Sequence, residues 1–315
     1  MNTGSHAPRD CWFLTGPTAS GKTEIGLELA ELLGAEIVSL DSMAVYRGMD
    51  IGTAKPSRDE RERVAHHLLD LVEPTQDYSL AQYVAAAEQA VATIMAQGRT
   101  ALFVGGTPLY LKSLLRGIFS GPPADWTLRS QWQEVIERDG AEQLHARLAQ
   151  VDPVSAQRLH PRDTRRVIRA LEVWEKTGQS ITVLQQQFDR SRPSAECRVF
   201  TLQWPRVELG GRIDARVEAM FAAGFVDEVR QLVDRYGRLG RTASQAVGYK
   251  EVLEHLSGTR DLDETRELVK LRTRQFAKRQ GTWFRSLSEC RTVKLTGAVD
   301  SRQIAAAISR EVPRE

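Results

Sequence analysis

The stretch GPTASGKT at residues 16–23 constrains the fold of this chain more than any other feature. It matches the pattern G-x-x-x-x-G-K-[ST], and it stands between an apolar run and a helical pattern, as that motif requires. Its glycines let backbone N–H groups point at anionic oxygens, the lysine adds a point charge, and the threonine hydroxyl can hold Mg²⁺. The motif predicts a phosphate-binding loop with Thr23 as the metal ligand. The predicted diphosphate- or nucleotide-binding residues are Gly16, Pro17, Thr18, Ala19, Ser20, Gly21, Lys22 and Thr23.

Short apolar runs alternate with longer helical patterns through the first third of the chain. Strands are predicted at 11–16, 35–42 and 100–107, and helices at 22–34 and 79–98. Gly34 suits the position just past the first helix, and Ser79 is a suitable N-cap for the second. Strand–helix–strand alternation with short connections predicts an α/β fold of the P-loop NTPase type, with a mostly parallel, doubly wound sheet.

The middle of the chain interrupts this alternation. SGPPAD at 120–125 stops the preceding helix, and residues 126–175 then have helical periodicity without a convincing strand. Strand character returns at 197–204, residues 205–289 are largely helical, and the pattern allows a last short strand at 292–296. We therefore expect a helical block inserted between strands of one sheet.

The expected domain limits follow from this interruption. Residues 1–120 and 198–315 are predicted to form the α/β core domain, and residues 121–197 the inserted all-helical domain. A chain of 315 residues is long enough for both.

The bulk composition excludes several classes of protein. A net charge of +2 gives no reason to expect a nucleic-acid partner, so any such case must be local. Cys11, Cys197 and Cys290 are far apart and lack CxxC spacing, which argues against a disulfide framework or a common zinc site. No apolar run approaches the roughly 18 residues that a membrane span needs, and no leader pattern opens the chain. We expect a cytoplasmic protein without a membrane partner.

Three predicted strands end in polar or glycine-rich stretches, at residues 16–23, 41–56 and 104–110. Because ligands bind at the carboxyl ends of strands in open α/β sheets, these stretches are expected to converge on one cleft. Asp41 is the one aspartate at a strand end, and a turn or N-cap role remains an alternative for it. Gly105 and Gly106 either admit a close backbone approach or form a simple tight turn.

Two adjacent histidines, His66 and His67, suggest a metal site at first sight. Neighbouring residues on a strand point to opposite faces of the sheet, so both side chains would not reach one ion. A structural role is expected for the pair.

Seven stretches, in this order, closely resemble the tRNA dimethylallyltransferases, also called tRNA isopentenyltransferases, of bacterial type. They are GPTASGKT, DSMAVYRGMDIGTAKP, HHLLDL, VGGTPLY, HPRDTRRVIRALEVW, VGYKE and KRQGTWFR. The resemblance covers roughly residues 11–290, and the second and last stretches are its most specific parts. One departure is Ala44, where many members of the family carry glutamine.

The resemblance implies transfer of a dimethylallyl group from dimethylallyl diphosphate to N6 of the adenosine 3′-adjacent to the anticodon of tRNA. The phosphate loop would then bind the diphosphate leaving group, with Mg²⁺ as cofactor. The residues matching the family's catalytic positions are Asp41, Thr18, Lys22 and Arg216. Asp41 would accept the proton of the amine, Arg216 would stabilise the diphosphate, and Thr18 and Thr107 would orient the reactants.

Local concentrations of positive charge fit an RNA partner, expected to be the anticodon stem-loop of tRNA. Residues 266–285 carry seven Lys or Arg and a single Glu, interleaved with Phe276, Trp283 and Phe284 as candidate stacking partners. Arg162, Arg165, Arg166 and Arg169 have the spacing of one helical stripe in the inserted domain, which is expected to contact tRNA. The target adenosine is expected to leave its stack. The full set of predicted tRNA-binding residues is Asp41, Ser42, Met43, Ala44, Thr107, Arg165, Arg166, Val167, Ile168, Arg169, Gln245, Ala246, Val247, Gly248, Tyr249, Lys250, Lys278, Arg279, Gln280, Thr282, Trp283 and Arg285.

Three alternatives remain open from the sequence. An ATP-binding P-loop kinase for a small metabolite would use the same loop, and Asp41 could be its metal carboxylate. An isopentenyltransferase acting on free adenine nucleotides would need less surface than the helical insertion and basic carboxyl-terminal third provide. A non-catalytic RNA-binding module would not require Asp41, Lys22, Thr23 and Arg216 together. For the tRNA dimethylallyltransferase prediction, a monomer is expected.

Overall fold

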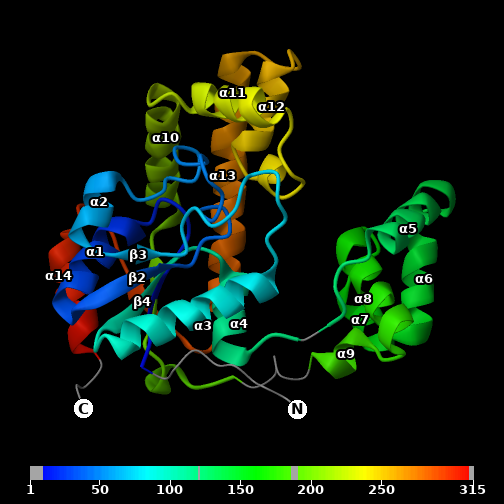
Figure 1. Ribbon diagram of the computed structural model, residues 1–315, viewed down its shortest axis with the longest axis horizontal. Coiled ribbons are helices and arrows are strands. Elements are labelled where there is room, and N and C mark those ends of the chain that lie inside the picture. Colours follow the sequence, from blue (N-terminus) through cyan, green and yellow to red (C-terminus); the bar gives the residue numbers. More distant parts are fainter. Residues whose placement is uncertain (1–9, 120, 186–190, 312–315) are drawn as a thin grey trace. The chain divides into compact units, whose positions relative to one another are not determined.

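The computed structural model describes residues 10–119, 121–185 and 191–311. It divides the chain into two compact units, one formed by residues 116–190 and the other by the described parts of 6–115 and 191–315 (Figure 1). The boundaries lie at 115/116 and 190/191, where the sequence suggested 120/121 and 197/198. We call them the helical unit and the sheet unit.

The sheet unit is built on six parallel strands in the order β3-β2-β4-β1-β5-β6. Their bounds are Trp12–Thr15 (β1), Ala35–Ser39 (β2), His66–His67 (β3), Thr100–Gly105 (β4), Val199–Gln203 (β5) and Cys290–Lys294 (β6). Parallel pairing throughout, with helices between the strands, confirms the predicted α/β fold. The second strand ends before Leu40 and Asp41, and the last begins at Cys290, two positions before the expected Thr292.

Alternating side chains of the central strands pack against helices on both faces of the sheet. On one face, Trp12 and Leu14 join a core with α1 (Lys22–Leu33) and α14 (Ser301–Arg310). On the other, Phe13 stacks on Phe103 with ring centroids 4.8 Å apart. The sequence analysis did not anticipate α14 or the short α2 (Arg58–Arg63).

The two helices predicted in the first third form as expected, and their ends explain why. Helix α1 stops at Gly34, which has φ 59°, and α3 (Leu80–Ala96) starts behind Ser79 in a capping box with Gln82. Tyr83 on α3 donates its hydroxyl to the Ser39 carbonyl at 3.0 Å, which fixes α3 against the end of β2. Helix α4 (Pro108–Arg116) follows β4 directly.

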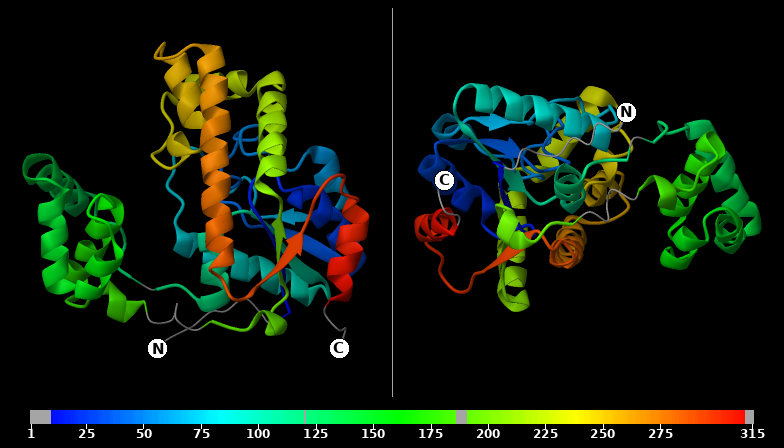
Figure 2. Two further views of the ribbon diagram at one scale, coloured as in Figure 1. Left: turned by 180° about the vertical axis from the view of Figure 1, so that it is seen from behind. Right: turned by 90° about the horizontal axis from the view of Figure 1, so that it is seen from below.

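Four further helices complete the sheet unit: α10 (Arg206–Ala222), α11 (Phe225–Tyr236), α12 (Tyr249–Leu256) and α13 (Leu262–Arg285). The long helices α10 and α13 lie side by side, with α11 and α12 near one of their ends (Figures 1 and 2). Short 3-10 turns lie at Ser194–Glu196 and Ala243–Gln245. Tyr46, Phe225 and Tyr249 are the large side chains of a second core under α11 and α12.

The helical unit contains helices alone among its described residues, as the sequence predicts. They are α5 (Trp126–Asp139), α6 (Ala141–Val151), α7 (Pro153–Arg158), α8 (Thr164–Thr177) and α9 (Ile181–Leu184). Trp132, Leu148 and Leu171 lie at the centre of its core. Two charged residues in the described part of this unit are buried as well: Asp152, 2% exposed, and Glu172, 0% exposed.

Glu172 has partners for both carboxylate oxygens. It accepts from Nε of Arg129 at 2.9 Å, from Nη2 of Arg129 at 2.8 Å, from the Asp125 N–H at 2.7 Å, and from Arg169. Burial alone would raise the pKa of Glu172, but hydrogen bonds from Arg129, Asp125 and Arg169 outweigh it and lower the pKa. The carboxylate therefore stabilises the helical unit above its ordinary pKa, and this contribution is lost as pH falls through the lowered value.

Glu172→Gln is expected to destabilise the helical unit by about 3 kcal/mol, because it leaves two partly buried arginines without a countercharge. Hydrogen exchange of the α8 amides in the full chain measures the loss. Glu175→Gln on the same helix is the matched control, since Glu175 pairs at 3.1 Å with the more exposed Arg147. Equal protection of α8 in both variants would contradict a stabilising role for Glu172.

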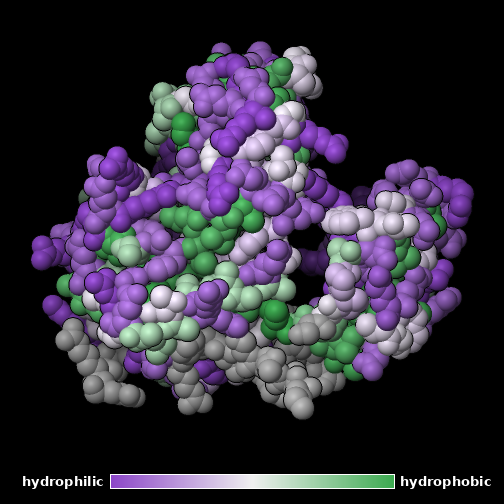
Figure 3. Space-filling view, in the orientation of Figure 1, coloured by the Kyte–Doolittle hydropathy of each residue, from purple (hydrophilic) through white to green (hydrophobic). Residues whose placement is uncertain are grey.

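The surface is mostly hydrophilic on the face in Figure 3, with an apolar patch over the middle of the sheet unit. Among the described residues, no helix combines the length and the apolar character that a membrane crossing requires.

Candidate active site

The loop between β1 and α1 carries the predicted phosphate-binding residues 16–23, and its Ala19 has φ 62°, a left-handed conformation that is uncommon for a residue other than glycine. Gly21 is the N-cap of α1 and has φ 88°, in the left-handed region that favours glycine. The helix therefore starts directly at the loop, where its free N–H groups and positive dipole end favour an anion. Lys22 folds back and donates its Nζ to the Pro17 carbonyl at 2.7 Å.

Trp204, which follows β5, and Arg212 on α10 hold other carbonyls of this loop. Trp204 donates its Nε1 to the Ser20 carbonyl at 3.0 Å, and Arg212 donates its Nε to the Ala19 carbonyl at 2.9 Å. The Arg212 guanidinium also lies over the Trp204 ring, 4.3 Å from its centroid. The conformation of the loop is thus fixed from outside. The loop motif gives no signal for either residue, and the sequence analysis missed both.

The structure brings together Asp41, Lys22 and Arg216, three residues that the sequence analysis placed in catalysis. Burial and the neighbouring Arg216 lower the pKa of Lys22 to about 7, while Asp41 acts in the opposite direction. Burial also lowers the pKa of Arg216, again opposed by Asp41. Lys22 and Arg216 are like charges that destabilise each other, and they lie beside a loop of N–H donors. A bound anion would therefore stabilise both cations.

Asp41 organises the turn after β2. Its Oδ1 accepts from the Met43 N–H at 2.8 Å and from the Ala44 N–H at 3.4 Å. This is the turn role that the sequence left open, and it leaves the half-buried carboxylate at the carboxyl edge of the sheet. Ala44 itself is buried, and its carbonyl accepts from the Asp70 N–H at 3.1 Å.

The ends of β2 and β4 meet beside the loop, as the sequence analysis predicted. A Cβ on Gly105 would lie 2.2 Å from the Leu40 carbonyl oxygen, so this approach requires glycine. Thr107 accepts from the Ser42 N–H through its Oγ1 at 3.1 Å. The glycines therefore admit a neighbouring strand end, and Thr107 fixes the residue that follows Asp41.

The predicted RNA contacts at 245–250 are only partly exposed. Gln245 and Lys250 lie at the surface, Val247 is half-buried, and Ala246, Gly248 and Tyr249 are buried. The Tyr249 hydroxyl donates to Glu228 at 2.6 Å, and Glu228 also accepts from the N–H groups of residues 50–52. Through Glu228, the buried Tyr249 therefore helps to hold the backbone of the stretch DIGTAKP in place.

The predicted RNA contacts on α13 divide in the same way. Lys278, Arg279, Thr282 and Arg285 are exposed and Trp283 is half-buried, while Gln280 and Phe284 are buried. The expectation that Phe284 stacks on RNA is wrong, because its ring is 1% exposed within the core. Phe276 is 36% exposed and lies under the Arg279 guanidinium, 5.9 Å from it.

Ion pairs redistribute the positive charge along α13. Lys270 pairs with Glu218 and Glu267 at 2.6 Å, and Arg274 pairs with Asp214. These two cations of the first half are thereby compensated, whereas the exposed Arg272 donates to the Gln275 amide oxygen at 3.2 Å. Exposed positive charge therefore remains at Arg272 and, nearer the carboxyl-terminal end, at Lys278 and Arg279.

In the helical unit, the predicted four-arginine stripe does not form as expected. Arg162 precedes α8, which begins at Thr164, and Arg169 turns toward Glu172 and the Pro122 carbonyl. Arg166 stays near Asp163, 3.4 Å away, and Arg165 also has an interaction partner. The predicted contacts Val167 and Ile168 are buried in the core of this unit.

Metal ligands from the protein are sparse. Among the described residues, no group of three or more His, Cys, Asp or Glu could hold an ion. His66 bonds the Val64 carbonyl through Nδ1 at 2.7 Å and His67 bonds Glu36 through Nε2 at 2.5 Å, consistent with the expected structural role. Mg²⁺ commonly keeps its waters and takes one or two protein oxygens beside substrate phosphates. The exposed Thr23 hydroxyl and the Asp41 carboxylate fit that donor set.

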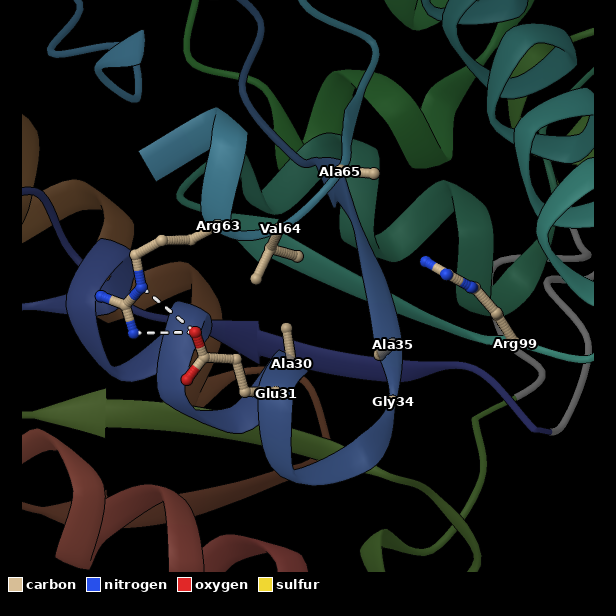
Figure 4. Close-up of a pocket in the computed structure, with 8 residues that line it drawn as sticks. All are labelled: Ala30, Glu31, Gly34, Ala35, Arg63, Val64, Ala65 and Arg99. Atoms are coloured by element: carbon tan, nitrogen blue, oxygen red, sulfur yellow. Dashed lines mark hydrogen bonds and ion pairs between the residues drawn. The ribbon is translucent and has the colours of Figure 1, made fainter. Parts of the chain in front are cut away.

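A pocket of about 270 Å³ lies at the opposite, amino edge of the sheet (Figure 4). It contains Arg63 and Arg99, which already pair at 3.0 Å with Glu31 and Glu36, respectively. Because these cations are compensated, the pocket does not compete with the phosphate loop as an anion site.

Comparison with known proteins agrees with this geometry. The family model of the IPP transferases matches residues 44–287. A tRNA dimethylallyltransferase of Rhodopirellula baltica is 48% identical over 290 residues, covering 90% of this chain and 87% of that protein. One from Pelotomaculum thermopropionicum is 44% identical and covers 94% of both chains.

Solved structures are also similar. The tRNA isopentenylpyrophosphate transferase of Bacillus halodurans has a TM-score of 0.69 at 35% identity, covering 96% of this chain and 95% of that one. A eukaryotic dimethylallyltransferase, seen in crystal structures acting on tRNA, has a TM-score of 0.71 at 27% identity, covering 90% and 73%. With its loop, carboxylate and two cations at one sheet edge, this chain belongs to the IPP transferase family.

Proposed function

We propose that this protein transfers a dimethylallyl group from dimethylallyl diphosphate to N6 of the adenosine 3′-adjacent to the anticodon of tRNA, releasing diphosphate. The observation that carries the proposal is the grouping of Asp41 with Lys22 and Arg216 beside the phosphate loop. Lys22 and Arg216 supply the positive charge that a leaving diphosphate needs. Asp41 supplies the group that can accept a proton from the amine. The protein is further proposed to act as a monomer in the cytoplasm.

The loop, Lys22 and Arg216 serve the leaving group. As the bond between the allylic carbon and the diphosphate oxygen breaks, negative charge grows on the diphosphate. Donors and cations fixed at that point stabilise the transition state more than the bound substrate, which lowers the barrier. Mg²⁺, held by Thr23 with Asp41 nearby, would supply further positive charge to the diphosphate.

Asp41 serves the acceptor. The N6 amine is a weak nucleophile because its lone pair is delocalised into the purine ring. As the N6–carbon bond forms, the amine loses a proton, and the Asp41 carboxylate accepts it. The adenosine reaches this site by leaving its stack, as enzymes that modify a base generally require. The similarity to a dimethylallyltransferase acting on tRNA supports this step.

The exposed end of α13 is proposed to contact RNA phosphates. Lys278→Ala and Arg279→Ala are each expected to weaken tRNA binding and to reduce the slope of log K against log salt by about 1. Lys270→Ala is the matched control on the same helix, because that ammonium already pairs with two carboxylates. Filter binding across a salt series measures the slopes, and equal slopes for all three variants would remove α13 from the RNA interface.

One assay separates the proposal from its alternatives. The protein is incubated with labelled dimethylallyl diphosphate, Mg²⁺ and either unmodified tRNA or AMP. Label in tRNA with released pyrophosphate supports the proposal, and label in AMP supports the free-nucleotide enzyme. Transfer from γ-labelled ATP to a small metabolite would identify a kinase, and no transfer at all would leave an RNA-binding module.

A further inference from the structure

Gln280 connects the phosphate loop to the end of β4. It lies on α13, 4% exposed, and its amide is used on both sides. Its Oε1 accepts from the Thr18 N–H at 2.9 Å, and its Nε2 donates to the Gly106 carbonyl at 2.6 Å. One side chain from the carboxyl-terminal part of the chain thus spans two loops of the donor site.

The chemistry of this position specifies glutamine. The Thr18 N–H requires an acceptor and the Gly106 carbonyl requires a donor, and a carboxamide offers both. A glutamate would present a second acceptor to the Gly106 carbonyl, and a methionine would leave both groups unpaired in a buried place. The Gln280 amide also packs closely on Gly106: a Cβ on Gly106 would lie 2.7 Å from the Gln280 Nε2, so there is no room for a side chain at position 106.

The contact defines the conformation of Thr18. With its N–H held by Gln280, the Thr18 backbone is fixed within the phosphate loop, where its side chain is half-buried. Lys22, Arg212 and Trp204 hold the carbonyls of Pro17, Ala19 and Ser20, respectively, on either side of Thr18. Gln280 is the anchor from α13. On the same helix, the two residues directly before it, Lys278 and Arg279, are exposed.

We propose that Gln280 is a positioning residue for the diphosphate donor: it sets the geometry of Thr18 and of the β4 turn, and it is not an RNA contact. This inference rests on the proposed function of the same site. It assigns Gln280 a role different from that of its neighbours on α13, whose side chains face solvent.

The test compares Gln280→Met and Gln280→Glu with the matched control Gln275→Met, an exposed glutamine on the same helix. Both Gln280 variants are expected to weaken pyrophosphate binding and to raise the KM for dimethylallyl diphosphate by about tenfold, the equivalent of one lost hydrogen bond. Their Kd for tRNA, measured without donor, is expected to stay within about twofold of wild type. The control is expected to change neither value.

Three outcomes would overturn the inference. A raised Kd for tRNA with an unchanged donor KM would make Gln280 an RNA contact. A lowered Tm with unchanged donor KM, kcat and pyrophosphate affinity would make it merely structural. Full rescue by Gln280→Glu would show that the donor half of the amide is not used. Because pyrophosphate binding is measured without RNA or a prenyl group, it tests Gln280 even if wild-type protein fails to prenylate tRNA.

Discussion

Asp41→Asn is expected to lose most of the prenyl-transfer rate while tRNA binding is retained. Asparagine keeps the oxygen that accepts from the Met43 and Ala44 N–H groups, so the turn after β2 stays in place. It no longer has a carboxylate to accept the amine proton. Loss of a general base of this kind lowers kcat by about 10²–10⁴-fold.

Single-turnover transfer with saturating donor and tRNA measures the effect on the chemical step, and filter binding measures tRNA affinity. Asp41→Ala is the companion variant, in which both the base and the turn contacts are removed. If Asp41 acted only through the turn, Asp41→Asn would turn over at nearly the wild-type rate while Asp41→Ala would not. That pattern would remove the carboxylate from the mechanism.

The second large effect is expected for the cations beside the loop. Lys22→Met and Arg216→Met are each expected to lower kcat/KM for dimethylallyl diphosphate by about 10²–10³-fold, because each removes a charge that stabilises the leaving diphosphate. Since the two charges disfavour each other before the anion binds, the double variant is expected to lose less than the product of the single losses.

Pyrophosphate release under donor-limiting conditions gives these values. Arg230→Met is the control, since Arg230 is an exposed arginine on α11 that pairs with Asp227. Strict multiplicativity of the two single losses would show that Lys22 and Arg216 act on the donor independently. If either single variant changed kcat/KM for dimethylallyl diphosphate no more than Arg230→Met does, that cation would have no role in the donor site.

Local patterns in the sequence were sufficient for the frame of the fold. The apolar run, glycines and helical period around residues 11–34 specify β1, the loop and α1 within one short stretch, and Ser79 marks the start of α3. The same logic placed Asp41 and Thr107 at one sheet edge, because strand ends of a parallel sheet must meet there.

Contacts between distant residues were not predictable in this way. Gln280 was assigned to RNA because its neighbours are basic, and no local signal shows that its amide reaches Thr18, 262 positions away. Trp204 and Ser20 are 184 positions apart. Phe284 was expected at the surface because it follows Trp283 in a basic stretch, and only tertiary packing places it in the core.

The anchoring of the phosphate loop has a consequence for fragments of this protein. A piece ending near residue 120 would contain every letter of GPTASGKT, yet it would lack Trp204, Arg212, Arg216 and Gln280. Without these anchors the loop would sample many conformations. Binding an anion would then require ordering the loop, and the entropy lost would weaken binding. The anchors of the motif near the beginning of the chain are therefore complete only when ribosomal synthesis has delivered α13, so donor binding reports on the folding of the sheet unit as far as α13.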